Sequence, residues 1–209
     1  MAHDQSSSPE STQETALPIF PLNTVLFPGA WLPLRVFETR YVDMTRDCLK
    51  RNRPFGVCLI REGREVGSPA VPHDVGCLAR IVECDIQQLG VMQLITVGAQ
   101  RFRIRDRKTN PQGLVVANVD FIADEATTPL ADEYRNCAQL LELMIQKNGD
   151  GIFPKPHRPA DADWVGYRLA EKLPLPLGAR QQLLEMRDSG ARLAAIQRLL
   201  TGVDPAASS

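Results

Sequence analysis

The stretch LPIFPLNTVLFPGAWLPLRVFETR, residues 17–40, sets the start of the fold. Residues 17–22 are apolar and include two prolines, which cannot donate hydrogen bonds to a sheet, so this run is typical of an edge strand or of strand ends. Residues 32–37 predict a second strand. Thr39 predicts the cap of a helix that continues to about Asn52, because its hydroxyl can accept a hydrogen bond from a backbone amide of the first turn.

Beyond this stretch, the chain up to residue 124 keeps the period of two that is typical of strands. A short turn at residues 88–90 predicts a hairpin. We expect the remaining strands over residues 55–61, 75–86, 91–97, 101–107 and 114–122. Six or seven strands with one helix, joined mainly by short turns, predict a small closed or half-closed β-barrel over residues 16–124.

After residue 124 the apolar period becomes that of helices. Thr128 and Pro129 are typical of a helix cap and first helical residue, and Gly149 of a helix end. The proline-rich residues 152–160 predict a linker or an ordered loop. Further helices are expected to begin at Asp161 or Asp163, at Pro176 and at Ser189. The sequence therefore predicts an α+β fold whose C-terminal subdomain, residues 125–202, has four helices.

The two ends of the chain differ from the rest in composition. Residues 1–15 and 203–209 are rich in small or polar residues and poor in large apolar ones. Such segments cannot bury enough apolar surface to offset the entropy of ordering, so we expect disordered tails.

Composition narrows the classes of function. The 209 residues have a formal net charge of −1, so no overall field attracts nucleic acid or an anionic membrane. No run reaches the roughly 20 apolar residues of a membrane span, and the start has no apolar core of a secretory signal, so we expect a cytoplasmic protein. The five cysteines are odd in number and not closely spaced, which predicts neither a zinc site nor a disulfide framework. We expect no metal and no cofactor.

Three blocks occur in order along the chain. The first is LPIFPL, VLFPG, LPL, FE and RY within residues 17–41, the second is VGCLARI at residues 75–81, and the third is Gly98 with QRF at residues 100–102. Together they resemble the N-terminal domain of Lon proteases, and the likeness extends over about residues 16–202.

The resemblance implies a twisted β-barrel of the PUA-like kind followed by a helical bundle, in agreement with the predicted elements. In full-length Lon this domain recognises unfolded or tagged protein substrates and helps to assemble the oligomer. A related domain occurs in cereblon, an adaptor of a ubiquitin ligase. We therefore expect a module that binds unfolded or tagged polypeptides or one specific protein partner, and that acts as an adaptor or a sequestering factor for proteolysis substrates.

No catalytic residues are predicted. The sequence has no Gly-x-x-x-x-Gly-Lys-Ser/Thr phosphate loop, and the Ser–Lys pair of Lon lies in a domain that these residues do not include. The three histidines, His3, His73 and His157, have no serine or cysteine nearby in the sequence that suggests a nucleophile pair. An unrecognised hydrolase is therefore only the third hypothesis.

Four large aromatic residues are the candidates for contact with a bound peptide, although each could instead belong to the core or to the seam between the subdomains. They are Trp31, Phe153, Trp164 and Tyr167. The aromatic residues that carry the resemblance have spacings that favour core packing, and they are Phe20, Phe27, Phe37 and Tyr41.

An arginine at every second position is the sharpest charge feature. Strand geometry would place Arg101, Arg103, Arg105 and Arg107 on one face, and Phe102 and Ile104 on the other. Such a row could track phosphates, and PUA-like barrels include RNA binders, so RNA binding is the alternative function. We favour a solvated face paired with nearby acids, because the net charge is near neutral and no aromatic side chain shares that face for base stacking. Nucleic acid is therefore not the expected partner.

Overall fold

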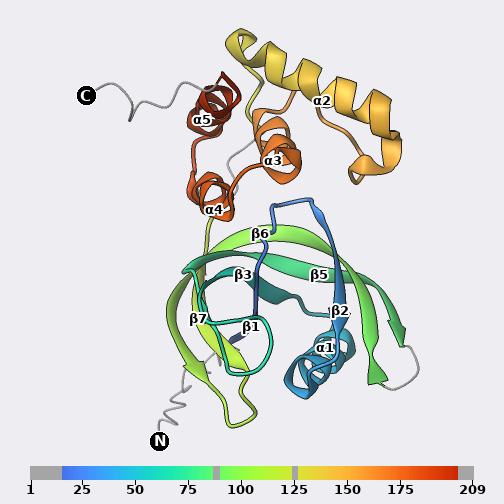
Figure 1. Ribbon diagram of the computed structural model, residues 1–209, viewed down its shortest axis with the longest axis vertical. Coiled ribbons are helices and arrows are strands. Elements are labelled where there is room, and N and C mark those ends of the chain that lie inside the picture. The colour runs from blue at the N-terminus through green and yellow to red at the C-terminus, as the bar shows by residue number, and fades with distance from the viewer. Residues whose placement is uncertain (1–15, 87–89, 124–126, 202–209) are drawn as a thin grey trace, which may run out of the picture.

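The computed structural model describes residues 16–86, 90–123 and 127–201. The strands and helix α1 form a barrel, and helices α2–α5 gather beyond one end of it (Figure 1). Both predicted tails and the predicted boundary at residue 124 lie outside the described residues. No helix in the described part is both long and apolar enough to cross a membrane.

The barrel closes on itself. Among the described residues its strands are β1 (Leu17–Leu22), β2 (Trp31–Val36), β3 (Phe55–Glu62), β4 (Val71–Pro72), β5 (Val75–Ile86), β6 (Met92–Thr109) and β7 (Val115–Phe121). Strands β1, β7, β6, β5 and β3 are neighbours in that order, and β1 also pairs with β3, so these five complete a ring. The β1–β3 pairing is parallel. Strand β2 lies off the ring, paired with β6. The prediction of a closed barrel of six or seven strands is confirmed.

Strand β6 is one element where the sequence predicted two. Its 18 residues run through Gly98, which had been placed between the predicted strands 91–97 and 101–107. The amide of Gly98 donates to the carbonyl of Ala30 (2.8 Å), and its carbonyl accepts from the amide of Gly29 (2.7 Å). A Cβ at Gly98 would stand 2.1 Å from the carbonyl oxygen of Phe27. The glycine therefore allows the loop before β2 to approach the sheet, and it does not interrupt the strand.

Helix α1 (Thr39–Arg51) connects β2 to β3 and packs on the barrel. Thr39 is its first helical residue, and Glu38 is the cap, without a side-chain hydrogen bond, so the predicted cap was one residue late. The ring of Tyr41 stacks on Phe20 of β1, with centroids 4.0 Å apart. This contact fixes the helix against the first strand.

The second part contains four helices, as predicted. They are α2 (Arg135–Asn148), α3 (Ala162–Lys172), α4 (Leu177–Glu185) and α5 (Ser189–Thr201), with 3-10 turns η2 (Asp132–Tyr134) and η3 (Asp150–Ile152). The predicted start at Thr128 and Pro129 is wrong, because Pro129 forms a β-bridge with Asp161. The amide of Leu130 donates to the carbonyl of Ala160, and that of Ala162 to Thr128. Residues 128–130 thus pair with residues 160–162 and do not begin the helix that the local sequence predicts.

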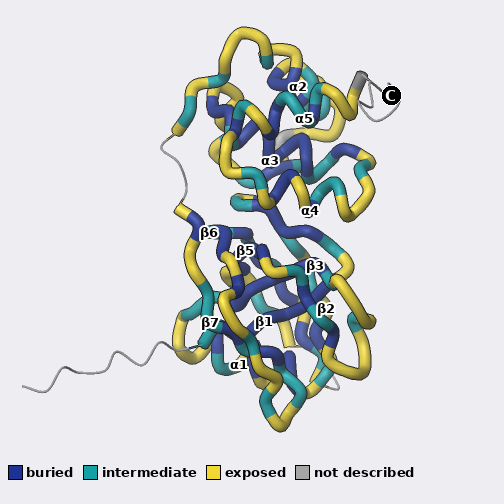
Figure 2. The backbone as a smooth tube through the Cα atoms, turned by 90° about the vertical axis from the view of Figure 1, so that its left-hand side faces the viewer, coloured by how far each residue is buried: buried dark blue, intermediate teal, exposed yellow. Residues whose placement is uncertain are grey.

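The larger of two apolar clusters continues from the barrel into the helices. Barrel residues such as Phe27 and Leu94 belong to the same buried cluster as Tyr167 and Leu193 of the helical part. The rings of Phe27 and Tyr167 lie 5.9 Å apart across the junction. Buried backbone runs through the junction between the two parts (Figure 2). The junction is therefore a packed interface, and the seam between the parts has a defined shape.

Candidate functional site

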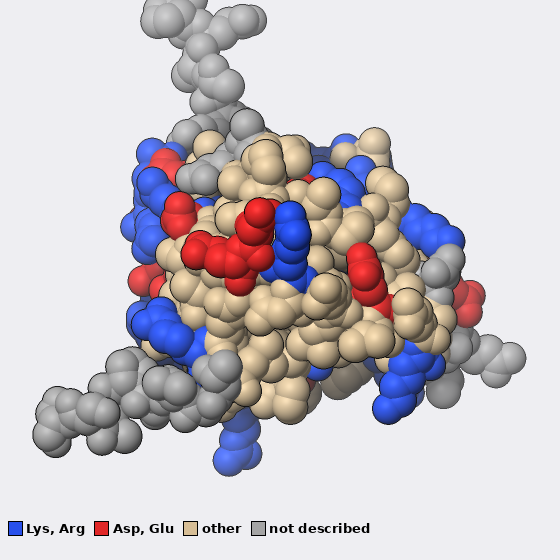
Figure 3. Space-filling view, turned by 90° about the horizontal axis from the view of Figure 1, so that it is seen from above, with Lys and Arg blue, Asp and Glu red and all other residues tan. Residues whose placement is uncertain are grey.

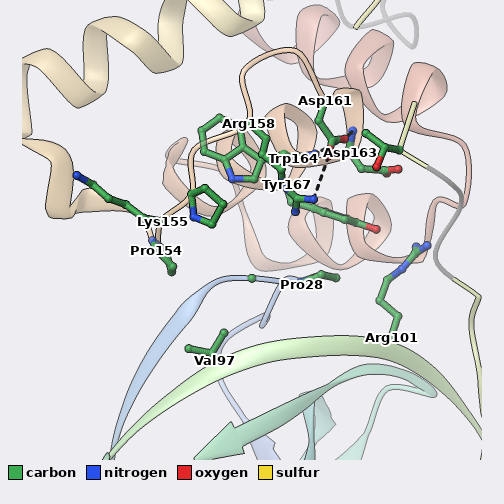
Figure 4. Close-up of a pocket in the computed structure, with 13 residues that line it drawn as sticks. Pro28, Val97, Arg101, Pro154, Lys155, Arg158, Asp161, Asp163, Trp164 and Tyr167 are labelled. Atoms are coloured by element: carbon green, nitrogen blue, oxygen red, sulfur yellow. Dashed lines mark hydrogen bonds and ion pairs between the residues drawn. The ribbon is translucent and has the colours of Figure 1, made fainter. Parts of the chain in front are cut away.

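A cleft of about 450 Å³ lies at the seam between the barrel and the helices (Figure 4). Pro28, Gly29 and Val97 line its barrel side, and Trp164 and Tyr167 of α3 line its helical side. The proline-rich loop, residues 154–158, and Thr127 complete its rim. Its volume and its mixture of aromatic, apolar and charged lining are those of ligand sites in proteins.

The helical wall of the cleft is held rigidly. Asp161 caps α3, because its side chain accepts from the amides of Asp163 (3.0 Å) and Trp164 (3.2 Å). Phe153 packs edge-on against Trp164, with ring centroids 5.9 Å apart, and His157 lies 5.7 Å from the same indole. The predicted start of a helix at Asp161 is confirmed. The cap fixes where Trp164 enters the cleft.

Arg168 of α3 ties this wall to the barrel. Its guanidinium donates to the carbonyls of Pro28 (2.6 Å) and Gly29 (2.8 Å), and it forms an ion pair with Glu171 (3.1 Å). Burial lowers the pKa of Arg168, and the charge of Glu171 opposes that shift. Because Pro28 and Gly29 also line the cleft, the same contacts set the distance between its two walls.

Two further side chains on the seam reach carbonyl groups at the end of α4. Arg192 of α5 donates to the carbonyls of Leu183 (3.1 Å) and Met186 (2.6 Å), and Arg101 of β6 donates to those of Leu184 (2.9 Å) and Met186 (2.7 Å). Both guanidinium groups lie over the ring of Tyr167, at 4.1 Å for Arg192 and 5.7 Å for Arg101. The orientation of the helices on the barrel is thus set by charged hydrogen bonds, which are stronger and more directional than apolar contacts.

Two of the four aromatic candidates line this cleft. Trp164 and Tyr167 line it, and Phe153 packs behind Trp164. These three are buried, so most of their surface serves the core, while Trp31 is 46% exposed. Trp31 is paired with Val97 in the β2–β6 ladder, so both side chains are on the same face of the sheet. Trp31 therefore flanks the cleft from the barrel side.

The expectation that the four arginines share one face is wrong. Arg101 is buried on the helical seam, with 2% of its surface exposed. A β-bulge interrupts the β6–β7 ladder between Ile104 and Asp106, after which Arg107 pairs with Ala117. Since Ala117 belongs to the small second core with Phe102 and Ile104, Arg107 is on the opposite face from Arg103. The bulge reverses the alternation on which the prediction depended.

Two arginines that follow Arg101 in β6 form ion pairs with aspartates. Arg105 pairs with Asp120 (3.3 Å) and Arg107 with Asp74 (2.8 Å). Figure 3 shows one face of the helical part. Acidic and basic side chains lie there in small groups, with neutral surface between the groups. RNA binding along this strand stays a prediction, and the geometry does not supply the continuous basic row that motivated it.

Two other hollows lie on the barrel. One, of about 330 Å³, is lined by Phe20, Leu34, Phe37 and Val66 among others. Phe37 had been expected in the core, but it is 55% exposed, because it follows the last residue of β2 and precedes α1. The other, of about 500 Å³, lies between β2 and the ends of β5 and β6, near Cys84. Both are lined by residues of the barrel alone, whereas the seam cleft is lined by residues of both parts.

The described residues contain no group of three or more His, Cys, Asp or Glu side chains that could hold a metal ion. Burial raises the pKa of the thiols of Cys48, Cys58 and Cys137, which therefore remain protonated near neutral pH. A protonated, buried thiol is a poor nucleophile. None of these three cysteines lines the seam cleft, whose lining consists mainly of aromatic rings, prolines and charged side chains.

The sequence did not single out several residues of the cleft. Pro28, Val97, Lys155 and Arg158 line it together with the aromatic candidates. The proline-rich run 152–160 was identified only as a linker or an ordered loop, although it forms part of the rim of the cleft. Val97 carries no sequence signal for a site, because only the tertiary packing of β6 under α3 places it at the seam.

Three comparisons with known proteins point the same way. The family model described as "ATP-dependent protease La (LON) substrate-binding domain" matches residues 16–202. A crystal structure of a Lon N-terminal domain protein from Xanthomonas campestris superimposes with a TM-score of 0.74 at 39% identity, over 90% of this chain and 98% of that one. Lon protease 2 of Myxococcus xanthus is 26% identical over 88% of this chain and 23% of its own length.

A shorter match links the chain to the protein cereblon of Danio rerio, which is 29% identical over 52% of this chain and 26% of its own length. The chain spans about a quarter of the length of the curated relatives it matches.

Proposed function

Because the chain belongs to the family of LON substrate-binding domains, we propose that it is a polypeptide-binding module that captures substrates for proteolysis by another protein. It acts as an adaptor or as a sequestering factor, and it binds unfolded or tagged chains or one specific protein partner. It performs no chemistry of its own.

The observation that carries this proposal is the seam cleft with its fixed walls. An extended peptide presents apolar side chains and backbone polar groups together, and the cleft offers partners for both. Trp164, Tyr167 and Val97 supply apolar and aromatic surface, while Lys155 and Arg158 supply charge at the rim. The guanidinium of Arg168 holds Pro28 and Gly29 in place, so little ordering entropy would be lost when a peptide binds.

Exposed apolar surface around the cleft supports the same proposal. Trp31 is half exposed beside Val97, and tryptophan combines a large apolar area with one hydrogen-bond donor, the combination found at binding hot spots. Strand β2, which begins at Trp31, pairs on one side with β6 and lies off the closed ring of strands. An extended chain that leaves the cleft over Trp31 would run along this strand.

The test is binding of fluorescently labelled casein, a polypeptide without stable tertiary structure, measured by fluorescence anisotropy at low and high salt. Labelled single-stranded RNA is measured in parallel. We expect casein to bind and to keep most of its affinity at high salt, because apolar contacts are not screened. Absence of casein binding would contradict the proposal, and salt-sensitive RNA binding alone would favour the RNA alternative.

A matched pair of variants locates the site. Val97→Lys adds a long charged side chain to the barrel wall of the cleft, and Val82→Lys makes the same change at an exposed position of β5 outside it. We expect Val97→Lys to weaken casein binding by about tenfold or more, since losing a few apolar contacts removes about 1.4 kcal/mol. Val82→Lys should leave the affinity unchanged. Equal affinity of the two variants would place the site elsewhere.

A further inference from the structure

Arg101 is a buried cation that lines the seam cleft. It lies in the middle of β6 with 2% of its surface exposed, and it is one of the residues that form the cleft. Figure 4 shows its side chain rising from the strand toward the helices, beside Tyr167. A group that enters the cleft at this end meets the guanidinium directly.

The other buried arginines each have a carboxylate partner. Arg40 pairs with Glu38 (2.8 Å), Arg168 with Glu171 (3.1 Å), and Arg192 with Asp163 (2.6 Å). Arg101 has none among the described residues. The two acids that line the cleft are already engaged, Asp163 by Arg192 and Asp161 as the cap of α3. Arg101 is therefore the exception in a chain that otherwise neutralises its buried arginines.

The guanidinium of Arg101 donates hydrogen bonds to the described residues from one nitrogen only. Both of its hydrogen bonds leave from Nη1, to the carbonyls of Leu184 and Met186 at the end of α4. The Nε–H is buried and has no hydrogen-bond partner among the described residues, as is also the case for Arg40 and Arg168. The helix end offers partial negative charge, which stabilises the cation in part. The Nε and Nη2 donors form the planar fork that binds a carboxylate through two parallel hydrogen bonds.

We infer that Arg101 binds the C-terminal carboxylate of a polypeptide whose last residues occupy the seam cleft. The inference rests on the proposed function and adds which part of the polypeptide is recognised. A chain end can stop at Arg101, whereas an internal residue needs room for the chain to leave in two directions. A cleft of about 450 Å³ is in the range of small-ligand pockets, so it accepts a short chain end rather than a folded surface.

The apolar lining suits the residues that precede the carboxylate. Trp164, Pro28 and Val97 line the cleft away from Arg101, and Tyr167 lies between them and the guanidinium. A chain that ends in small apolar residues would place its side chains on this surface and its carboxylate on the arginine fork. Because the guanidinium is buried, the pair would be screened by salt much less than an exposed ion pair.

The experiment uses the unchanged protein and one short apolar peptide with an N-terminal fluorophore, in three forms. The forms are the free carboxylate, the C-terminal amide, and the amide with glutamate as the last residue. We expect the free carboxylate to bind about tenfold more tightly than the amide, because a charged hydrogen-bonded pair in a buried site is worth that factor or more. Affinity is measured by fluorescence anisotropy, with labelled casein as the reference for polypeptide binding.

Two variants test whether the Nε and Nη2 donors of Arg101 cause the preference for the free carboxylate. Arg101→Lys keeps the charge but loses the planar pair of donors, so the preference for the free carboxylate should fall several-fold. Arg46→Lys makes the same change at an exposed position of α1 outside the cleft and should keep the preference. Circular dichroism verifies that both variants fold. If Arg101→Lys does not, the peptide series on the unchanged protein still decides the inference.

Each outcome separates this inference from the proposed function. Equal affinity for the carboxylate and the amide, with casein still bound, overturns the inference and leaves polypeptide binding intact. Tight binding of the glutamate amide overturns the preference for a chain end, because a side-chain carboxylate would then suffice. A carboxylate preference that persists in Arg101→Lys excludes Arg101 as the group. Loss of casein binding as well contradicts the proposed function itself.

Discussion

Arg168 shows how one side chain connects the two parts of this molecule. Its guanidinium bonds the carbonyls of Pro28 and Gly29 in the barrel and the carboxylate of Glu171 on its own helix. Burying a charge without hydrogen-bond or ion-pair partners costs free energy, and the three partners of Arg168 offset this cost. Lysine could not replace it, because an ammonium group lacks the planar set of donors that reaches two carbonyls and a carboxylate together.

Gly98 is a second residue on which the seam depends, and its replacement gives a clear prediction. Gly98→Ala would place a methyl group 2.1 Å from the carbonyl oxygen of Phe27, so the loop before β2 must move away from β6. We expect a loss of about 2 kcal/mol in the free energy of unfolding, measured by urea denaturation.

Gly178→Ala is the control for Gly98→Ala, since an added Cβ in α4 meets nothing within 4 Å. Alanine favours a helix over glycine by up to about 1 kcal/mol, so this variant should be unchanged or more stable. Equal stability of both variants would show that the loop adapts to a Cβ at Gly98 without cost.

Single residues also show where prediction from the sequence succeeds and where it fails. Asp161 was identified as a helix start because capping is local, and the core positions of Phe20 and Phe27 followed from their spacing. Phe37 was assigned to the core in error, since spacing cannot tell the last buried position of a strand from the first position beyond it. The burial of Arg101 without a carboxylate partner among the described residues could not be predicted, because it results from the packing of α4 on β6.

At the scale of elements, β6 shows why local pattern has limits. Its register with β7 shifts between Ile104 and Asp106, which moves Arg107 to the face of Phe102. A bulge of one residue cannot be recognised from a period-two pattern of residues. The prediction that four arginines share one face was therefore wrong. The barrel, the helix between β2 and β3 and the four later helices were all predicted, because each has a long periodic signal.

The cap of α3 gives an element-scale prediction. Asp161→Ala removes the acceptor for the amides of Asp163 and Trp164, so the first turn of α3 should loosen at the wall of the cleft. We expect a loss of about 1 kcal/mol in unfolding free energy, together with weaker casein binding.

The matched variant for Asp161→Ala is Asp161→Asn, which keeps a side-chain oxygen at the cap and should stay within about 0.5 kcal/mol of the unchanged protein. If alanine and asparagine were equally harmful, the contribution of Asp161 would come from its ion pair with Arg158 rather than from capping.

At the scale of the whole molecule, the continuous core and the arginine contacts make the barrel and helices one cooperative unit. The two tryptophans report on this, because Trp31 belongs to the barrel and Trp164 to α3. In each of the variants Trp164→Phe and Trp31→Phe, which leave one reporter each, we expect the urea transition seen by tryptophan fluorescence to coincide with the one seen by far-UV circular dichroism.

Arg168→Met, introduced into both single-tryptophan variants, tests whether the seam is the cause of this coupling. Removing the buried cation leaves the carbonyls of Pro28 and Gly29 without their donor and Glu171 with Lys172 as its ion-pair partner, so it should cost about 3 kcal/mol. The fluorescence and circular dichroism transitions should then separate. Separate midpoints before that change would mean that the barrel and helices unfold independently.

The antiparallel pairing of β1 with β7, which is part of the closure of the barrel, also governs the order in which the molecule can be made. Leu17 of β1 pairs with Ala117 of β7, one hundred positions further along the chain. While the protein is being synthesised, its first strand emerges long before the strand that will cover its second edge exists. Until then that edge is open to other chains, and long-range closure is a slow step in folding. If the proposed function holds, a protein that binds unfolded chains thus itself passes through a stage in which it is such a chain.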